Sequence, residues 1–250
     1  MKKYLFVDLD DTLFSSLPKC VGQEDLHAVA FLKDGSACSF TTAKQRAFLS
    51  MAGQSMTLIP TTARNSDAFG RVDLPFDDYK IINYGGVVLT PSGVPDQAWL
   101  ETMREEMASS LGGLHRAISI IDEFSQRVGL AGRARLIEDY GIPFYVVVKD
   151  PDKVAERLAL IEQDVLAPWI AAEGSEFYVH RNGNNLAVLP KALNKARAVE
   201  YVIGLLRNNY GQVLTMGMGD SRSDARFMAA CDYAIVPSGT QLAALSLGML

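Results

Sequence analysis

Short apolar runs that end abruptly in polar residues recur along the chain. They cover residues 4–7, 57–60, 80–82, 213–216 and 233–236. None of these runs alternates apolar with polar positions, and that pattern is typical of strands buried on both faces of a parallel sheet. We therefore expect these runs to form a buried parallel sheet.

Amphipathic helical patterns lie between the apolar runs. Thr42 and Gln45 have the spacing of a capping box, and the apolar residues that follow share one helical face: Ala43, Ala47, Phe48 and Met51. Residues 194–207 show the same pattern, with Ala196, Val199, Ile203 and Leu206 on one face. Strands that alternate with helices predict an α/β fold with a doubly wound, Rossmann-like parallel sheet.

Two segments interrupt this alternation. Residues 28–40 have the pattern of a hairpin that turns at Asp34 and Gly35, just beyond the first strand. The longer interruption has its own expected elements: a helix at 96–111, a strand near Ile118, a helix at 133–140, a strand at 144–148, a helix at 152–172 and a hairpin at 177–189. These elements can bury a core of their own. We therefore predict an inserted α+β domain at residues 85–189, within a core domain formed by residues 1–84 and 190–250.

Composition excludes several classes of protein. The chain has 250 residues, of which 48% are hydrophobic, so it can bury a sizeable core. Its net charge of −5 disfavours a dedicated nucleic-acid binder, which would present a basic face. The apolar runs are too short to cross a membrane, and the three cysteines form no CxxC pair. We expect a soluble, cytoplasmic protein, and no pattern indicates its oligomeric state.

An acidic cluster follows the first apolar run. Asp8 and Asp10 stand at alternate positions, followed by Asp11 and Thr12. Ligands of open α/β sheets bind beyond the carboxyl ends of the strands. Two carboxylates that face one site repel each other unless a cation or a shared proton relieves them, and Mg²⁺ is the simplest hard cation with oxygen ligands. The alternative is that these residues only cap a helix or fill a loop.

A second acidic cluster follows the run at 213–216. Asp220 and Asp224 are four residues apart and would share a face if a helix began at Ser221. First-turn acids that stabilise a helix dipole would explain this cluster by itself. They do not explain two acidic clusters at the ends of two neighbouring strands.

Groups suited to binding an anion lie near two further predicted strand ends. Thr61, Thr62 and Arg64 follow the run at 57–60, and Lys195 stands at the start of the helix expected at 194–207. A lysine opposes the helix dipole at that end, which suggests a role near anions, although a solvated surface lysine is the simpler alternative. Carboxylates, a cation, a hydroxyl and a lysine together match the requirements of phosphoryl transfer.

These residues carry a resemblance to a known family. The chain resembles the haloacid dehalogenase superfamily of phosphatases, whose first motif, DxDx[T/V], stands here as Asp8 to Thr12. Thr62 matches the second motif and Lys195 the third, while Asp220 and Asp224 match the fourth, GDxxxD. The insertion between the second and third motifs is similar to the α/β cap of sucrose-phosphate phosphatase and related bacterial sugar phosphatases.

The resemblance implies a role for each matching residue. Asp8 would be the nucleophile and Asp10 the general acid and base. Thr62 and Lys195 would bind the phosphoryl oxygens. Arg64 resembles the arginine of the TGR motif in the sugar-phosphatase branch and would join them as a phosphate- or substrate-binding residue. Mg²⁺ would be held by Asp8, by the backbone carbonyl of Asp10 and by Asp220, with Asp224 assisting: metal ligands Asp8, Asp10, Asp220 and Asp224.

The sequence departs from the family pattern at three places. Ala63 replaces the glycine of TGR, and Ser223 replaces the asparagine that commonly precedes the last aspartate of the fourth motif. The Asn-Gly pair that often follows the third strand stands here as Tyr84-Gly85, with Asn83 one position early.

The function expected from these motifs is Mg²⁺-dependent hydrolysis of a phosphomonoester, with a small phosphorylated metabolite such as a sugar phosphate as substrate. A phosphomutase of the same family and a non-catalytic protein that binds a phosphorylated ligand are the alternatives. A phospho-receiver module combines similar residues, but it is about half this length. We expect neither a nucleic-acid nor a membrane partner.

Overall fold

The structure, a computed structural model, describes residues 1–246 and 248. It divides into two compact units, the first formed by Met1–Leu100 with Asn194–Leu250 and the second by Glu101–Leu193. The predicted domain boundaries, after residues 84 and 189, both lie before these divisions. The predicted core domain extends to residue 250, and its residues 247, 249 and 250 lie outside the described residues.

The first unit contains the expected parallel sheet. Its strand order is β13-β12-β1-β5, and every neighbouring pair is parallel. The strands are β1 (Lys2–Val7), β5 (Thr57–Pro60), β12 (Val213–Met218) and β13 (Tyr233–Ile235). The strand β6 (Lys80–Ile82) continues the sheet through a single parallel bridge between Thr61 and Ile81. Tyr4, Leu5, Phe6 and Val7 of β1 are fully buried, as the absence of alternation predicts.

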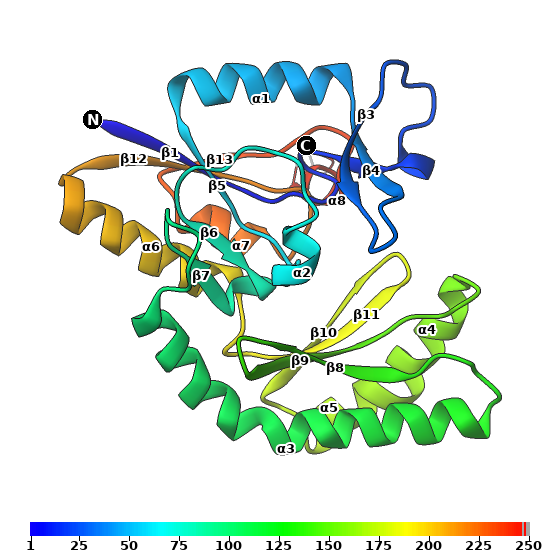
Figure 1. Cartoon of the computed structure of the whole chain (residues 1–250). Coiled ribbons are helices and arrows are strands. Elements are labelled where there is room, and N and C mark those ends of the chain that lie inside the picture. The colour runs from blue at the N-terminus through cyan, green and yellow to red at the C-terminus, as the bar shows by residue number, and fades with distance from the viewer. Residues whose placement is uncertain (247, 249–250) are drawn as a thin grey trace. The chain divides into compact units, whose positions relative to one another are not determined.

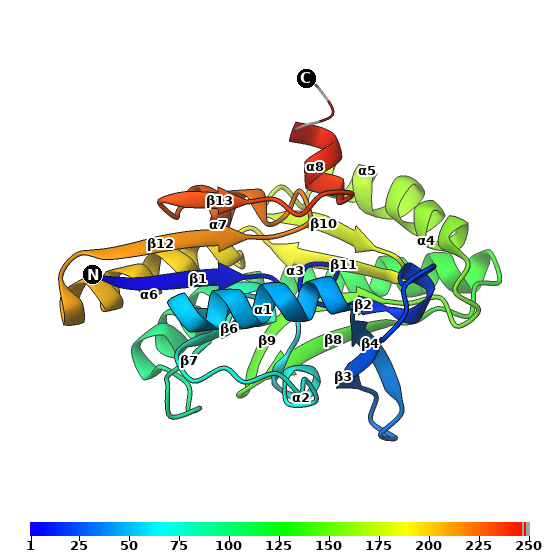
Figure 2. The same cartoon turned by 90° about the horizontal axis from the view of Figure 1, so that it is seen from above.

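Helices cover both faces of this sheet (Figures 1 and 2). Helix α1 (Ala43–Ser55) lies on one face, and α6 (Lys195–Tyr210) and α7 (Ala225–Ala229) lie on the other. The predicted capping box is present, because the Thr42 hydroxyl accepts a hydrogen bond from Gln45 N and the Gln45 side chain accepts one from Thr42 N. These layers confirm the doubly wound α/β class. The unit also contains the helices α2 (Ser66–Phe69) and α8 (Gln241–Ser246) and the 3-10 turns Leu17–Lys19 and Asn83–Gly85.

Two small antiparallel sheets complete the first unit. The hairpin predicted at residues 28–40 is present as β3 (His27–Phe31) and β4 (Ala37–Thr41), with β2 (Ser15–Ser16) paired to β4. It turns at Asp34 and Gly35, where Gly35 has a φ of 83° and the Asp34 carboxylate accepts a hydrogen bond from Ser36 N. The other sheet pairs β6 with β7 (Val87–Leu89).

The second unit packs helices against an antiparallel sheet of order β10-β11-β9-β8. Its strands are β8 (Ala134–Asp139), β9 (Ile142–Val148), β10 (Phe177–Asn182) and β11 (Asn185–Pro190). The helices are α3 (Gln97–Arg127), which begins in the first unit, and α4 (Ala155–Ile161) and α5 (Ala167–Ala172), which a π-helical turn at Glu162–Leu166 connects. Phe124, Val146, Trp169 and Phe177 belong to one core that joins both layers.

Two predictions for this unit were wrong. Ile118 lies within α3 and not on a strand, although Gly112 and Gly113 disfavour a helix at this point. Helix α3 continues through them because Leu114, Ala117 and Ile121 pack into the core of the unit, and Gly113 leaves room for the Phe177 ring, which a Cβ would meet at 2.4 Å. The helix predicted at residues 133–140 is absent, and residues 134–139 form β8, because their pairing with β9 through a turn at Tyr140 and Gly141 outweighs helix propensity.

Candidate active site

Three parallel strands end at the same level of the sheet. Val7, the last residue of β1, pairs with Met218 of β12 on one side and with Pro60 of β5 on the other. The next residues continue this alignment, because Asp8 N donates to Met218 O and Thr61 N donates to Val7 O. In the sheet, β5 is the neighbour of β1 on one side, and β12, which comes much later in the chain, is its neighbour on the other. Ligands of such sheets bind at this point, where the strand order reverses.

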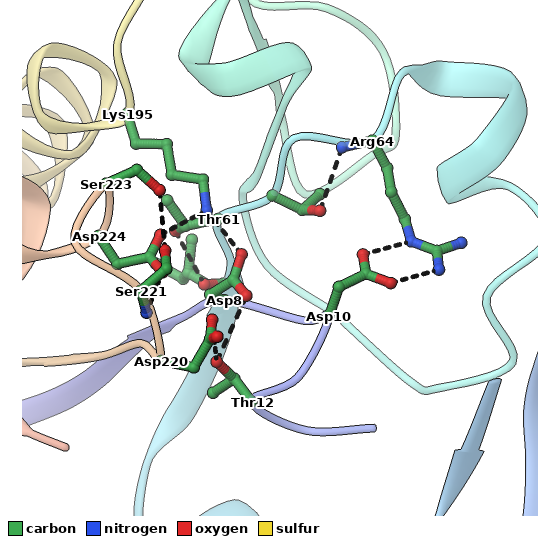
Figure 3. A network of polar contacts seen from close by, with 12 residues as sticks. Asp8, Asp10, Thr12, Thr61, Arg64, Lys195, Asp220, Ser221, Ser223 and Asp224 are labelled. Atoms are coloured by element: carbon green, nitrogen blue, oxygen red, sulfur yellow. Dashed lines mark hydrogen bonds and ion pairs between the residues drawn. The ribbon is translucent and has the colours of Figure 1, made fainter. Parts of the chain in front are cut away.

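The Lys195 ammonium joins two buried carboxylates (Figure 3). Its Nζ lies 2.6 Å from Asp8 Oδ1 and 2.7 Å from Asp224 Oδ1. All three side chains are less than a tenth exposed. Lys195 reaches this place because it is the first residue of α6, whose N-cap Asn194 accepts a hydrogen bond from Arg197 N. A solvated surface lysine is thereby excluded.

The pKa values of this buried trio, Lys195, Asp8 and Asp224, reflect one cation shared by two carboxylates. Burial alone would lower the pKa of Lys195, but Asp224 and Asp8 more than offset it and raise the pKa above its usual value. Burial raises the pKa of Asp8 well above normal, and Lys195 reverses this only in part because Asp224 adds repulsion. Burial also opposes ionisation of Asp224, but Lys195 and the hydrogen bonds from Ser221 hold its pKa below normal. Asp224 is therefore the more firmly ionised carboxylate.

Asp220 lies beside the trio and is linked to Asp8 by a threonine. Thr12 Oγ1 lies 3.3 Å from Asp8 Oδ2 and 3.4 Å from Asp220 Oδ1, so its single proton serves one or the other. Burial, followed by repulsion from Asp224 and Asp11, raises the pKa of Asp220 to about 6. Nothing in the sequence pattern singled out Thr12 beyond its place in the first motif.

Asp8, Asp220 and Asp224 form a set that fits a divalent cation. One carboxylate oxygen from each lies within 4.8 Å of the others. Three carboxylates near a single lysine leave an excess of negative charge, and oxygen atoms are the ligands that Mg²⁺ prefers. The donor chemistry of the set and the raised pKa values of Asp8 and Asp220 therefore agree with a site for a hard divalent ion. The carboxylate of Asp10 is not part of this set.

Asp10 instead pairs with Arg64, as Figure 3 shows. Arg64 Nε and Nη2 donate to the two oxygens of Asp10 at 2.8 and 2.7 Å, a bidentate arrangement. Burial would lower the pKa of Arg64, but the bonds to Asp10 raise it. Thr62 is fully buried, and its hydroxyl accepts a hydrogen bond from Arg64 N at 3.2 Å. The Thr61 hydroxyl, in contrast, donates a hydrogen bond to the backbone oxygen of Ile59.

A sequence model of the sucrose-6F-phosphate phosphohydrolase family matches residues 1–245. The chain belongs to this family. The match confirms the resemblance to the haloacid dehalogenase-like phosphatases and to their sucrose-phosphatase branch. Among curated proteins, the chain is similar to a glucosyl-3-phosphoglycerate/mannosyl-3-phosphoglycerate phosphatase of Persephonella marina, at 34% identity over 76 residues. That similarity covers 30% of this chain and 28% of the relative.

Solved structures share the fold of this sucrose-6F-phosphate phosphohydrolase family member. The sucrose-phosphatase of Synechocystis, solved in complex with sucrose and phosphate, aligns over 100% of this chain and 97% of its own, with a TM-score of 0.51 and 15% identity. The C-terminal domain of the C. albicans trehalose-6-phosphate phosphatase aligns over 92% of this chain and 73% of its own, with a TM-score of 0.55 and 12% identity. None of the helices in residues 1–246 is long and apolar enough to span a membrane.

The helix that would place Asp220 and Asp224 on one face does not begin where that arrangement requires. No helix begins at Ser221, because α7 starts at Ala225 with Asp224 at its N-cap position. The Asp224 carboxylate accepts hydrogen bonds from both Ser221 N and Ser221 Oγ, which folds the preceding loop back onto it. Gly219 permits this fold, since a Cβ there would lie 2.4 Å from Asp224 Cβ. Ser221 is a polar partner that the spacing of the acids did not reveal.

Proposed function

We propose that this chain is a Mg²⁺-dependent phosphomonoester hydrolase that acts on a sugar phosphate through an aspartyl-phosphate on Asp8. The observation that carries the proposal is the buried contact of Lys195 Nζ with Asp8 and Asp224. A lysine held against one carboxylate of a buried acidic set can offset the charge of an incoming phosphoryl group. A structural ion pair alone would not require a third acid, Asp220, beside it.

Asp8 supplies the nucleophile. One of its carboxylate oxygens attacks phosphorus, the bond from phosphorus to the ester oxygen breaks, and Asp10 gives a proton to the leaving alcohol. Water then attacks phosphorus, Asp10 accepts a proton from it, and the Asp8 carboxylate is released with inorganic phosphate. Lys195 and Thr62 bind the phosphoryl oxygens during both steps. Arg64 orients the carboxyl of Asp10 through its two hydrogen bonds.

The metal-binding residues would be the carboxylates of Asp8 and Asp220 and the backbone carbonyl of Asp10, with Asp224 assisting directly or through water. Mg²⁺, when bound there, would neutralise charge on the phosphoryl oxygens. Burial and, after it, repulsion from Asp224 raise the pKa values of Asp8 and Asp220, and without the metal the same negative charge would oppose binding of a phosphate dianion.

The inserted domain would select the substrate. We propose that residues 85–189, which include most of the second unit, Glu101–Leu193, form a cap of the kind found in sugar phosphatases. The family description and the sucrose-phosphatase that binds sucrose and phosphate support a phosphorylated sugar as substrate. The relative from Persephonella marina is a phosphatase of glucosyl- and mannosyl-3-phosphoglycerate, so a phosphorylated glycoside is a second kind of sugar-containing substrate to test.

The test is phosphate release from p-nitrophenyl phosphate, sucrose 6-phosphate, trehalose 6-phosphate and glucosyl-3-phosphoglycerate, with Mg²⁺ and with a chelator. Release that requires the metal and favours one sugar phosphate supports the proposal. Asp8→Asn should abolish release, and Asp10→Asn should reduce it on the order of a hundredfold. Failure of the folded protein to release phosphate from any substrate would overturn the hydrolase assignment.

A further inference from the structure

Three consecutive residues adopt a left-handed backbone at the end of β6. The φ angles of Asn83, Tyr84 and Gly85 are 52°, 56° and 94°. Only glycine adopts such angles without steric cost, so two of these residues are strained. A strained turn of this kind persists only where the surrounding structure holds it in place.

Hydrogen bonds hold this turn from two sides. Asn83 N donates to Arg64 O at 2.7 Å, and Tyr84 N donates to Thr62 O at 3.1 Å. On the other side, the buried indole Nε1 of Trp99 donates to Gly85 O at 2.9 Å. The turn is thus fixed both to the loop that carries Thr62 and Arg64 and to the first turn of α3.

Gly85 also lies directly against the start of α6. A Cβ on Gly85 would lie 2.5 Å from Asn194 O, 2.9 Å from Asn194 C and 3.1 Å from Lys195 Cα. The distances to Asn194 O and Asn194 C are shorter than the contacts that Cβ atoms make in real proteins. Both are backbone atoms, which cannot rotate away as a side chain can. Any side chain at position 85 must therefore displace the peptide that joins Asn194 to Lys195.

We propose that Gly85 is a positioning residue for Lys195. Its missing side chain lets the strained turn support the Asn194–Lys195 peptide, and this contact sets the point from which the lysine side chain reaches Asp8 and Asp224. The same turn bonds the backbone of Thr62, so it fixes the positions of Thr62 and Lys195, the residues assigned to phosphoryl binding, relative to each other. This inference rests on the proposed function for the catalytic consequence, but the position of Lys195 can be tested without it.

The test compares Gly85→Ala with Gly93→Ala. Gly93 also has a positive φ, 84°, and belongs to the same unit, but nothing lies within 4 Å of the position of its Cβ. Both variants bear the cost of a left-handed alanine, and only the first displaces the start of α6. We expect Gly85→Ala to lower kcat and to weaken competitive inhibition by inorganic phosphate, each about tenfold or more, since misplacement by about 1 Å can cost a hundredfold. Gly93→Ala should leave both within about twofold of wild type.

A second pair of variants covers the case in which Gly85→Ala does not fold. Trp99→Phe removes the hydrogen bond to Gly85 O and keeps an aromatic ring beside Tyr201. We expect it to reduce kcat and phosphate affinity about two- to fivefold, as the loss of one hydrogen bond predicts. Trp169→Phe, at an equally buried tryptophan of the second unit, should leave both unchanged.

The outcomes separate the two proposals. A loss of thermal stability in Gly85→Ala and Trp99→Phe, with wild-type kcat and phosphate affinity below the melting temperature, would overturn the positioning role. If the wild-type protein releases no phosphate, the proposed function fails, and a crystal structure of Gly85→Ala decides the positioning role alone. Displacement of Lys195 Nζ from Asp8 and Asp224 would support it, and an unmoved Nζ would overturn it.

Discussion

Both carboxylate oxygens of Asp10 are held by Arg64, although the two residues lie on different loops of the first unit. The guanidinium is buried to a large extent, and its side chain is 14% exposed. A planar fork of donors fixes the orientation of a carboxylate, which a single ammonium cannot do. The arginine expected to bind substrate therefore has a partner within the site itself.

Arg64→Lys should lower kcat about tenfold, because a lysine keeps the charge but loses the bidentate geometry that orients Asp10. The loss should be larger for a sugar phosphate than for p-nitrophenyl phosphate, whose leaving group needs little protonation. Steady-state kinetics on both substrates measures this difference. Arg71→Lys is the control, since Arg71 pairs at 2.7 Å with Asp67, a half-exposed residue of the same unit to which no catalytic role is assigned. Equal effects of the two variants on both substrates would contradict this role.

Lys195→Met should destabilise the metal-free protein by about 3–5 kcal/mol, because it leaves Asp8 and Asp224 buried without their cation. It should also abolish turnover. Denaturant unfolding in the presence of a chelator gives the stability. Lys33→Met removes a lysine whose side chain is 81% exposed and should change stability little. If Lys195→Met is as stable as Lys33→Met, Lys195 does not stabilise the fold by neutralising Asp8 and Asp224, and this prediction is wrong.

Mg²⁺ should raise the melting temperature of the wild-type protein, because an ion that binds only the folded state stabilises it by mass action. Asp220→Asn should reduce that increase, since it removes one of three clustered carboxylates. Asp34→Asn, which changes an exposed turn, should respond as the wild type does. Calorimetry with and without the metal measures the increase and needs no substrate. An undiminished increase in Asp220→Asn would exclude Asp220 as a ligand.

Asp232 should make stability depend on acidity. Hydrogen bonds from Thr215 N and from the Thr215 hydroxyl, both 2.8 Å, hold the pKa of Asp232 below its usual value. A depressed folded-state pKa contributes stability above the unfolded-state pKa of about 4, and that contribution is lost as the pH falls through the folded-state value. Asp232→Asn should therefore be less stable than wild type at neutral pH, and the difference should shrink below about pH 4. Urea unfolding at several pH values measures the difference in stability between the two proteins. A difference that stays constant with pH would show that Asp232 does not titrate with a lowered pKa in the folded state.

The core fold was predictable because its central strand β1 is buried on both faces from Tyr4 to Val7, although the edge strand β13 is largely exposed. Strand β1 ends at Val7, directly before Asp8, as predicted, and the lysine expected at a helix start is the first residue of α6. Positions at strand ends follow from topology, so the meeting of Asp8, Asp220 and Asp224 could be expected from a parallel sheet.

Other features depend on tertiary contacts that local sequence does not carry. The segment that forms β8 has good helix formers, and only its pairing with β9 makes it a strand. The double glycine in α3 is helical because the residues that follow it pack into a core with Phe177, which is distant in sequence and lies against Gly113. The pairing of Arg64 with Asp10 depends on the path of two loops, and no spacing rule relates residues so far apart in sequence.

The most direct test of the central claim is to look for the phosphoryl group on Asp8. The protein is mixed with Mg²⁺ and its preferred sugar phosphate, quenched in acid and treated with borohydride, which reduces an aspartyl-phosphate to homoserine. Mass spectrometry of the peptide that contains Asp8 should then show homoserine at this position, and no such product should form without substrate. Phosphate release that proceeds with Asp8 unmodified, and that persists in Asp8→Asn, would contradict the account.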